Sequence, residues 1–181
     1  MNLLIFSKTF IFNPNGKKCL TSNTTESIKQ LNGEVLIIAQ NHPCYSYSTC
    51  RSFKDNNEIV LVQQYPFSFL TKNNYFSDNI RAQEGAMLIL QDNFKADCII
   101  IDNIGFALAA ITYAEILNIP TIYLVYDDTV IDAEMCEINK WVCNKSNIVI
   151  KNGNIFMKNE TILENRFLSS LVDTLKLYLL E

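Results

Sequence analysis

Short apolar runs alternate along the chain with longer segments whose apolar residues recur at helical spacing. Five runs are apolar at all or nearly all positions, and they lie at residues 3–6, 35–39, 59–62, 98–101 and 121–125. Such runs are typical of strands that are buried on both faces, as in a parallel sheet covered by helices. We therefore expect them to be strands of a mainly parallel sheet.

Four other segments are predicted to be helices, because their apolar residues lie three or four positions apart. They span residues 22–31, 77–93, 106–117 and 132–144. Asn-Gly follows the first segment and Asn-Ile-Pro follows the third, and such residues end helices. Strands that alternate with helices predict an α/β fold with three layers. The sequence shows no composition break, so we expect a single domain over residues 1–181.

The last part of the chain, residues 129–181, is predicted to end in a β-hairpin and a helix. The apolar runs 148–150 and 155–157 flank an Asn-Gly pair, which favours a tight turn because both central residues need positive φ. An amphipathic helix over 162–179 follows. We expect its apolar side to pack against the sheet, and the alternative is a surface for a partner chain or a second copy.

Residues 40–57 are expected to form a long polar and aromatic loop. Aromatic residues in this segment and in the segment after position 62 would either line a cleft for an acceptor or cover the edge of a small sheet. These residues are Tyr45, Tyr47, Phe53, Tyr65, Phe67 and Phe69. The pattern leaves both alternatives open.

Composition and charge exclude several classes of protein. The 181 residues are 49% hydrophobic and 19% charged, with a net charge of -4, which is an ordinary globular composition. The Lys and Arg residues do not cluster, so a nucleic-acid groove is not expected. The first residues carry no basic segment, and no apolar run reaches the roughly 18 residues that span a bilayer. We therefore expect a cytoplasmic protein without a transmembrane segment.

The cysteine and histidine pattern argues against a metal centre. No pair among the six cysteines has the C-x2-C spacing of a zinc site, and His42 is the single histidine. We expect the thiols to be reduced and mostly buried, and we expect no bound metal and no cofactor. In a parallel α/β sheet, ligands instead bind beyond the carboxyl ends of the strands, where the strand order reverses.

Polar groups and glycines follow four of the predicted strands at these carboxyl ends. They are Ser7, Asn15 and Gly16, then Asn41 and His42, then Asp102, Asn103 and Gly105, and finally Tyr126, Asp127 and Asp128. Asn15 and Gly16 precede a helix, so they would approach a phosphate or carboxylate, or they form a simple turn. The dinucleotide pattern G-x-G-x-x-G is absent, which disfavours a small flavodoxin-like nucleotide-binding protein.

The acidic residues at the strand ends have two interpretations each. Asp102 would act as a general base on an acceptor hydroxyl or bind a sugar hydroxyl, or it caps the helix that begins near Gly105. Asp127 and Asp128 would bind a metal or share a proton, or they cap the next helix, which is the more ordinary role. His42 has no acidic or thiol neighbour in the sequence, so it is either part of the site or a polar loop residue.

Four stretches of sequence carry a resemblance to a known family. They are the first strand with the Asn-Pro-Asn-Gly loop at 13–16, the Gly-Glu-Val strand start at 33–35, the Ala-Asp-Cys-Ile-Ile-Ile-Asp strand at 96–102, and the Ala-rich helix with its Pro-Thr-Ile-Tyr-Leu-Val strand up to 127. In this order and spacing, residues 1–128 resemble the Rossmann-like N-terminal domain of GT-B glycosyltransferases of the family 4-like kind. Residues 129–181 do not match that domain well.

The resemblance implies that this domain binds the acceptor, while a second Rossmann-like domain binds the nucleotide-sugar. It implies a cleft lined by Gly16, Asp102, Asn103 and Asp127. The family often has histidines after the fourth and fifth strands, but the matching positions in this chain are Ile100 and Asp102, then Tyr126, so Asp102 becomes the candidate base. The donor-binding E-x7-E pattern has no counterpart in residues 129–181, where Glu134 and Glu137 are too close together and Glu160 and Glu164 are isolated.

Two functions of different classes follow from these observations. The first is the acceptor-binding half of a split or truncated glycosyltransferase, with a sugar or glycan acceptor and a partner chain that binds the donor. The second is a binding or regulatory protein that retains the fold without catalysis and pairs with a partner or with itself. The absent histidines and the absent donor domain favour the second function.

Overall fold

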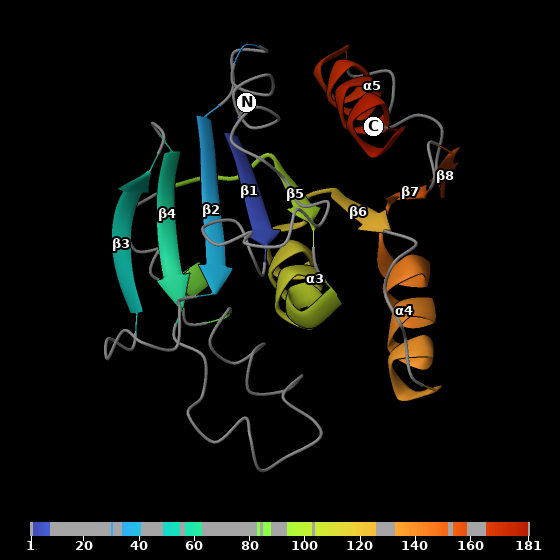
Figure 1. Cartoon of the computed structure of the whole chain (residues 1–181), viewed down its shortest axis with the longest axis horizontal. Helices are drawn as coiled ribbons and strands as arrows, with labels where there is room; N and C mark the ends of the chain where they lie inside the picture. The colour runs from blue at the N-terminus through green and yellow to red at the C-terminus, as the bar shows by residue number, and fades with distance from the viewer. Residues whose placement is uncertain are drawn as a thin grey trace.

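The computed structural model places all the described strands in one sheet. It describes residues 2–7, 30, 34–40, 49–54, 57–62, 83, 85–87, 94–102, 104–125, 133–151, 154–158 and 166–180. Within these residues the sheet has eight strands in the order β3-β4-β2-β1-β5-β6-β7-β8 (Figure 1). The fold is a three-layer, Rossmann-like α/β fold with a mainly parallel sheet.

The six inner strands of this order run parallel to one another. Each pairs with its neighbour in regular register, for example Leu3 with Val35 on one side and with Cys98 on the other. The six strands are β1 (Asn2–Ser7), β2 (Glu34–Gln40), β4 (Asn57–Val62), β5 (Cys98–Ile101), β6 (Thr121–Val125) and β7 (Ile148–Lys151). All five apolar runs predicted as strands are therefore confirmed, with small changes at their ends.

Alternate residues of these strands enter two separate cores. Even-numbered residues of β1 and β2 and odd-numbered residues of β5 and β6 face one core, and their neighbours face the other. The inner residues of β1, β2, β5, β6 and β7 are buried because helices cover both sides. The 3-10 turn η2 (Ile104–Phe106), α3 (Ala107–Leu117) and α4 (Ala133–Lys145) cover one side, which we call the α3 face. The other side, the α5 face, is covered by α5 (Arg166–Leu180).

The predicted closing helix packs against the sheet, as expected. Leu168, Leu171, Val172 and Leu175 of α5 are buried in the core of the α5 face. These four apolar side chains are therefore not available as a surface for a partner. The helix begins at Arg166, and the earlier residues Ile162 and Leu163 lie outside the described residues.

Two other predicted helices are confirmed closely, and two are only partly described. The segments predicted at 106–117 and 132–144 correspond to α3 and α4. Asn118 ends α3 in the left-handed conformation, with φ 54° and ψ 48°. Of the segment at 77–93, residues 83 and 85–87 are helical, and Met87 of its apolar pattern is 57% exposed while Ala86 is buried. Of the segment at 22–31, the structure describes Gln30 alone, in a turn.

The expectation of a loop over residues 40–57 is wrong, because it contains the edge strand β3 (Thr49–Lys54). This strand pairs antiparallel with β4, and Lys54 lies opposite Asn57. Its mixed sequence shows no apolar run, since an edge strand needs only one partner and less burial. Two residues, Asp55 and Asn56, connect the strands and lie outside the described residues.

The predicted C-terminal hairpin is confirmed as β7 and β8 (Asn154–Met157). The two strands pair antiparallel, with Lys151 opposite Asn154, so two residues connect them. The Asn-Gly pair at 152–153 occupies this connection and lies outside the described residues. Ile155 and Met157 pack against the core of the α5 face, and β8 forms the edge of the sheet among the described residues.

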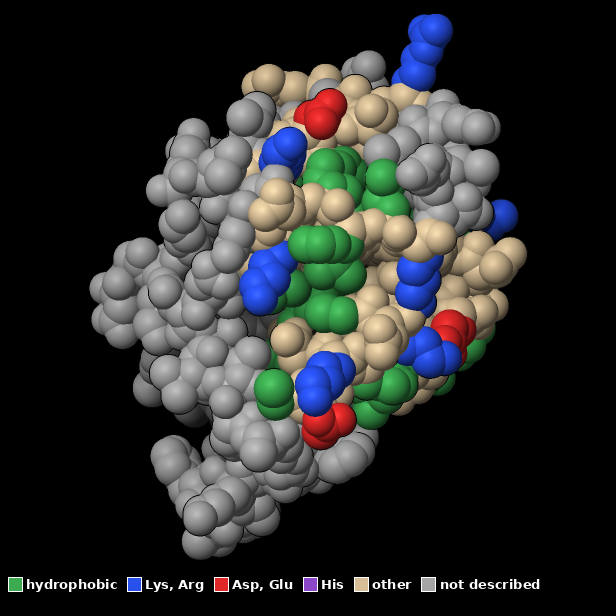
Figure 2. All heavy atoms as spheres, turned by 90° about the vertical axis from the view of Figure 1, so that its right-hand side faces the viewer, with side chains coloured by type: hydrophobic (Ala, Val, Ile, Leu, Met, Phe, Trp, Pro, Cys, Tyr) green, Lys and Arg blue, Asp and Glu red, His purple; other side chains and the backbone are tan. Residues whose placement is uncertain are grey.

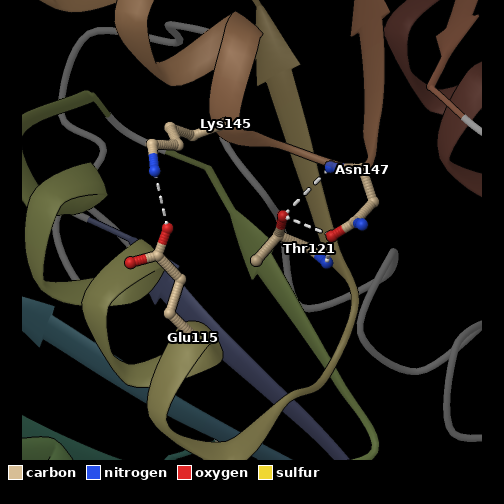
Figure 3. A network of polar contacts seen from close by, with 4 residues as sticks. All are labelled: Glu115, Thr121, Lys145 and Asn147. Atoms are coloured by element: carbon tan, nitrogen blue, oxygen red, sulfur yellow. Dashed lines mark hydrogen bonds and ion pairs between the residues drawn. The ribbon is translucent and has the colours of Figure 1, made fainter.

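Polar contacts join neighbouring elements at the amino ends of the parallel strands. The Asn147 carbonyl Oδ1 accepts bonds from the Thr121 backbone N–H at 2.9 Å and from its hydroxyl at 3.1 Å, and the Asn147 N–H donates to that hydroxyl at 3.2 Å. Close by, Lys145 of α4 forms a 2.9 Å ion pair with Glu115 of α3 (Figure 3). These contacts fix β6 against β7 and α3 against α4.

The described helices contain no segment long and apolar enough to cross a membrane.

Candidate functional site

The strand order reverses between β1 and β5. From β1 the chain proceeds outward to β2 and β4 on one side, and from β5 it proceeds outward to β6 and β7 on the other. At such a reversal the connections leave the sheet in opposite directions, which opens space beyond the carboxyl ends of the two central strands. The ends of β1 and β5 are therefore the place where a ligand site is expected.

A serine and an aspartate meet at this reversal. The Ser7 hydroxyl donates a hydrogen bond of 2.6 Å to Oδ2 of Asp102, and both residues are buried, with Asp102 5% exposed. This length is that of a good hydrogen bond between two side-chain oxygens. The serine thus holds the Asp102 carboxyl group in place inside the protein.

The register of the sheet brings these two residues together. Phe6 pairs with Ile101, and the Asp102 backbone N–H donates to the Phe6 carbonyl at 3.0 Å, so the pairing continues one residue beyond β5. Leu3, Ile5, Cys98 and Ile100 belong to the core of the α5 face. Side chains alternate between the two faces of a strand, so Ser7 and Asp102 lie on the same face as these four apolar residues. They are the polar residues at the carboxyl ends of the two central strands.

The segment after Asp102 forms a 3-10 turn before the helix. Gly105 lies buried within η2, and α3 begins after Phe106, which takes the N-cap position without any side-chain bond. Asp102 therefore does not take the N-cap position of α3, because η2 separates it from the first turn of that helix. A capping role of Asp102 toward the helical segment that begins near Gly105 stays a prediction, and its carboxyl group accepts a bond from Ser7 across the sheet.

Most of the site residues named from the sequence lie outside the described residues. They are Asn15, Gly16, His42, Asn103, Tyr126 and Asp127. Two of them directly follow described elements at the carboxyl edge, since β5 ends before Asn103 and β6 ends at Val125 before Tyr126. The structure thus describes Asp102, Gly105 and the ends of the strands. The roles of the other residues stay predictions.

Ser7 is the residue whose role the sequence did not reveal. It stands among the polar groups at the strand ends, but no pattern in the sequence links it to Asp102, 95 positions later. The signal in the sequence that could have pointed to Ser7 is that a hydroxyl residue ends an apolar run typical of a buried strand. Only the pairing of β1 with β5 shows which distant residue it contacts.

The described cysteines do not supply a nucleophile at this site. Burial raises the pKa of the Cys98 thiol to about 12, so the thiol is neutral, and a neutral thiol is a poor nucleophile. Burial also raises the pKa of Cys143, while Cys136 is exposed on α4. The thiols are free, as predicted, but of these three only Cys98 is fully buried. Within the described ranges, no three His, Cys, Asp or Glu residues lie close enough together to hold a metal ion.

Solved structures of other proteins have a similar fold, but comparison by sequence gives no match. No family model and no curated protein matches the chain. An α,α-trehalose-phosphate synthase (UDP-forming) from Burkholderia vietnamiensis matches with a TM-score of 0.53 at 12% identity, over 96% of this chain and 43% of that one. HepE from Anabaena, in complex with UDP and glucose, matches with a TM-score of 0.49 at 12% identity, over 84% of this chain and 38% of that one.

The likeness to the synthase shows the fold of this chain. The chain spans less than half of the length of either of these proteins.

Proposed function

We propose that the chain is the acceptor-binding, N-terminal half of a GT-B glycosyltransferase. It would act with a separate donor-binding domain to transfer a sugar from a nucleotide-sugar to an acceptor hydroxyl. The observation that carries the proposal is the buried Ser7–Asp102 pair at the reversal of the strand order. The fold shared with a UDP-forming synthase, of which the chain spans 43%, supports it.

In this proposal Asp102 is the general base. Its carboxylate takes the proton from the acceptor hydroxyl while the hydroxyl oxygen forms a bond to the sugar carbon of the donor. The bond from that carbon to the nucleoside diphosphate breaks, and the nucleoside diphosphate leaves with the electron pair. A general base must have a fixed orientation within hydrogen-bond reach of the proton it removes, and the 2.6 Å bond from Ser7 supplies that orientation.

The remaining candidate residues would surround the acceptor. Asn15 and Gly16 would lie against the acceptor or a phosphate, and the others would line the cleft because each follows a strand that ends at the same edge. These others are His42, Asn103, Gly105, Tyr126 and Asp127. The donor-binding domain would be a partner chain or a further part of the same polypeptide.

A second candidate function is a binding or regulatory protein without catalysis. The burial of Asp102 favours it, because a side chain that is 5% exposed and already accepts a bond from Ser7 has restricted access to an acceptor hydroxyl. In this case the Ser7–Asp102 pair would stabilise the carboxyl ends of the central strands. The protein would bind a sugar or a partner but would not transfer a sugar.

Calorimetry with Asp102→Asn tests the proposal. We would titrate the chain with a panel of mono- and disaccharides and with UDP-glucose, and repeat the titrations with Asp102→Asn. Asn keeps the shape and one acceptor oxygen for Ser7 but removes the charge. Because a bond to a charged group contributes about 1.5–3 kcal/mol, we expect the substitution to weaken binding of the acceptor sugar at least about tenfold.

The matched control is Asp97→Asn, at the amino end of the same strand. Asp97 is exposed, and its Oδ2 accepts a 2.7 Å bond from the Asn2 backbone N–H. This variant should bind the same sugar as the unchanged chain. Sugar transfer from UDP-glucose by the chain alone would contradict the need for a donor-binding domain. Sugar binding that is the same with and without Asp102→Asn would contradict the role of Asp102.

A further inference from the structure

The edge strand β8 carries an exposed aromatic residue at one end of the sheet. Phe156 is 58% exposed, although its register partner Val149 is buried in the core of the α3 face. Helix α4 covers β6 and β7 on this face through Val142 and Trp141. Phe156 lies one strand further out, so it belongs to the same face but remains uncovered among the described residues.

Two lysines flank Phe156 on the same face. Lys158 directly follows β8, and its backbone N–H donates to the Asn147 carbonyl at 3.1 Å, so the pairing with β7 continues by one residue. Lys151 lies opposite Asn154 on β7, so alternation directs all of these side chains to the α3 face. Both lysines are exposed. Figure 2 looks at this side of the molecule and shows hydrophobic side chains at the centre of the described surface, with Lys and Arg side chains around them.

The charges of this edge are not balanced. Lys140 and Lys145 at the same end of the fold pair with Glu137 and Glu115, whereas the ammonium groups of Lys151 and Lys158 form no ion pair in the described part of the chain. The unpaired positive charge of these two lysines is complementary to the carboxylates of an acidic partner.

The backbone of β8 offers a further means of binding. β8 has one strand neighbour, β7, among the described residues, so the N–H and C=O groups on its outer side take no part in the described sheet. Such an edge accepts an added strand, with backbone bonds giving affinity and alternate side chains giving specificity.

We propose that the β8 edge is a docking site for an extended acidic segment of a partner protein. The segment adds to β8 as a ninth strand of the sheet, places an apolar side chain on Phe156, and directs carboxylates to Lys151 and Lys158. The site is separate from the Ser7–Asp102 pair, because β8 lies at the edge of the sheet and the pair lies at its centre. The proposal therefore does not depend on the proposed function.

The test uses the full chain and a labelled synthetic peptide of eight residues in which glutamate alternates with valine and phenylalanine. Fluorescence anisotropy would measure its binding at low and high salt. We expect binding that weakens with salt, and a loss of about tenfold in both Lys151→Glu/Lys158→Glu and Phe156→Ser. Both changes affect exposed side chains, and thermal unfolding of each variant would show whether it remains folded.

Three controls make the outcome decisive. Lys95→Glu reverses an exposed charge before the central strand β5 and should leave binding unchanged. A peptide with lysine in place of glutamate, and one with proline at its centre, should not bind. Absence of binding by the acidic peptide, an equal loss in Lys95→Glu, or a concentration-dependent dimer that Phe156→Ser abolishes would each overturn the proposal, the last because a second copy would then be the occupant.

Discussion

Polar groups join the parallel strands at both ends of the sheet, but the two ends differ in the chemistry they use. At the amino ends, Thr121 and Asn147 exchange bonds between neutral side chains and backbone N–H groups. At the carboxyl ends, Ser7 and Asp102 form a bond between two buried side chains, one of which is a carboxylate.

The difference indicates which end serves the fold and which serves a function. The Thr121–Asn147 contacts satisfy backbone groups that would otherwise lose their partners on burial, so the requirements of folding explain them fully. A buried carboxylate costs several kcal/mol of desolvation, and an apolar pair would fill the same space at no such cost. The Ser7–Asp102 pair is therefore the part of the sheet that stability alone does not explain.

The largest expected effect is that of Ser7→Ala. It leaves the buried Asp102 carboxylate without its hydroxyl donor, so the free energy of unfolding should fall by about 3 kcal/mol. Urea denaturation of Ser7→Ala, Asp102→Asn and the double variant would measure it as a double-mutant cycle. Strictly additive effects in this cycle would mean that the two side chains are not coupled, and the comparison between the two ends would lose its basis.

A smaller loss is expected at the amino ends. Asn147→Ala removes the oxygen that accepts two bonds from Thr121, at about 1 kcal/mol each, so the free energy of unfolding should fall by about 2 kcal/mol. Asn147→Asp keeps an acceptor oxygen and should cost less in the same urea experiment. If both variants were as stable as the unchanged chain, the contact would not contribute to the fold.

Alkaline pH tests a second buried ionisable group on β5. Burial raises the pKa of Cys98 from 9.0 to about 12, so below pH 9 the thiol is protonated in both states and its contribution to stability is complete. Between pH 9 and pH 12 the unfolded chain loses this proton first, and stability should fall by about 1.4 kcal/mol per pH unit.

The measurement is urea denaturation at pH 8.5 and pH 10 for the unchanged chain and for Cys98→Ala. Tyr113, whose pKa burial raises from 10.0 to about 12, adds to the slope in both proteins, so the difference between their slopes isolates the thiol. Equal slopes would show that Cys98 keeps an ordinary pKa in the folded protein.

The smallest effect is expected for Lys145→Ala. Lys145 and Glu115 are 46% and 59% exposed, and solvent screens such a pair, so its loss should cost less than about 0.5 kcal/mol. Thermal unfolding would detect a change of this size only as a shift of one or two degrees. A loss comparable to that of Asn147→Ala would mean that the ion pair, and not the neutral contact, holds this end together.

The apolar runs predicted the inner strands well, because burial on both faces leaves a continuous signal in the sequence. Residues 98–101 and 121–125 coincide with β5 and β6, and the Asn-Gly pair marked the β7–β8 hairpin. The edge strand β3 escaped prediction because a strand with one partner does not require a continuous apolar run. Met87 shows the opposite error, since an apolar residue at helical spacing turned out to be exposed.

Of the candidate site, the sequence identified Asp102 but not its partner. A carboxylate after four apolar residues is visible in the sequence, whereas the serine that bonds to it is 95 positions away. The exposed β8 edge was not visible either, because Phe156 looks like any other apolar strand residue until its position at the end of the sheet is known.

The sequence by itself thus determined the class of fold, the inner strands and the acidic residue at the end of β5. These features depend on local patterns of burial and on residues that are adjacent in the chain. The tertiary structure alone decided the strand order, and with it the reversal between β1 and β5 and the contact of Ser7 with Asp102. The physical reason is that register and strand order arise from long-range pairing, which no local pattern encodes.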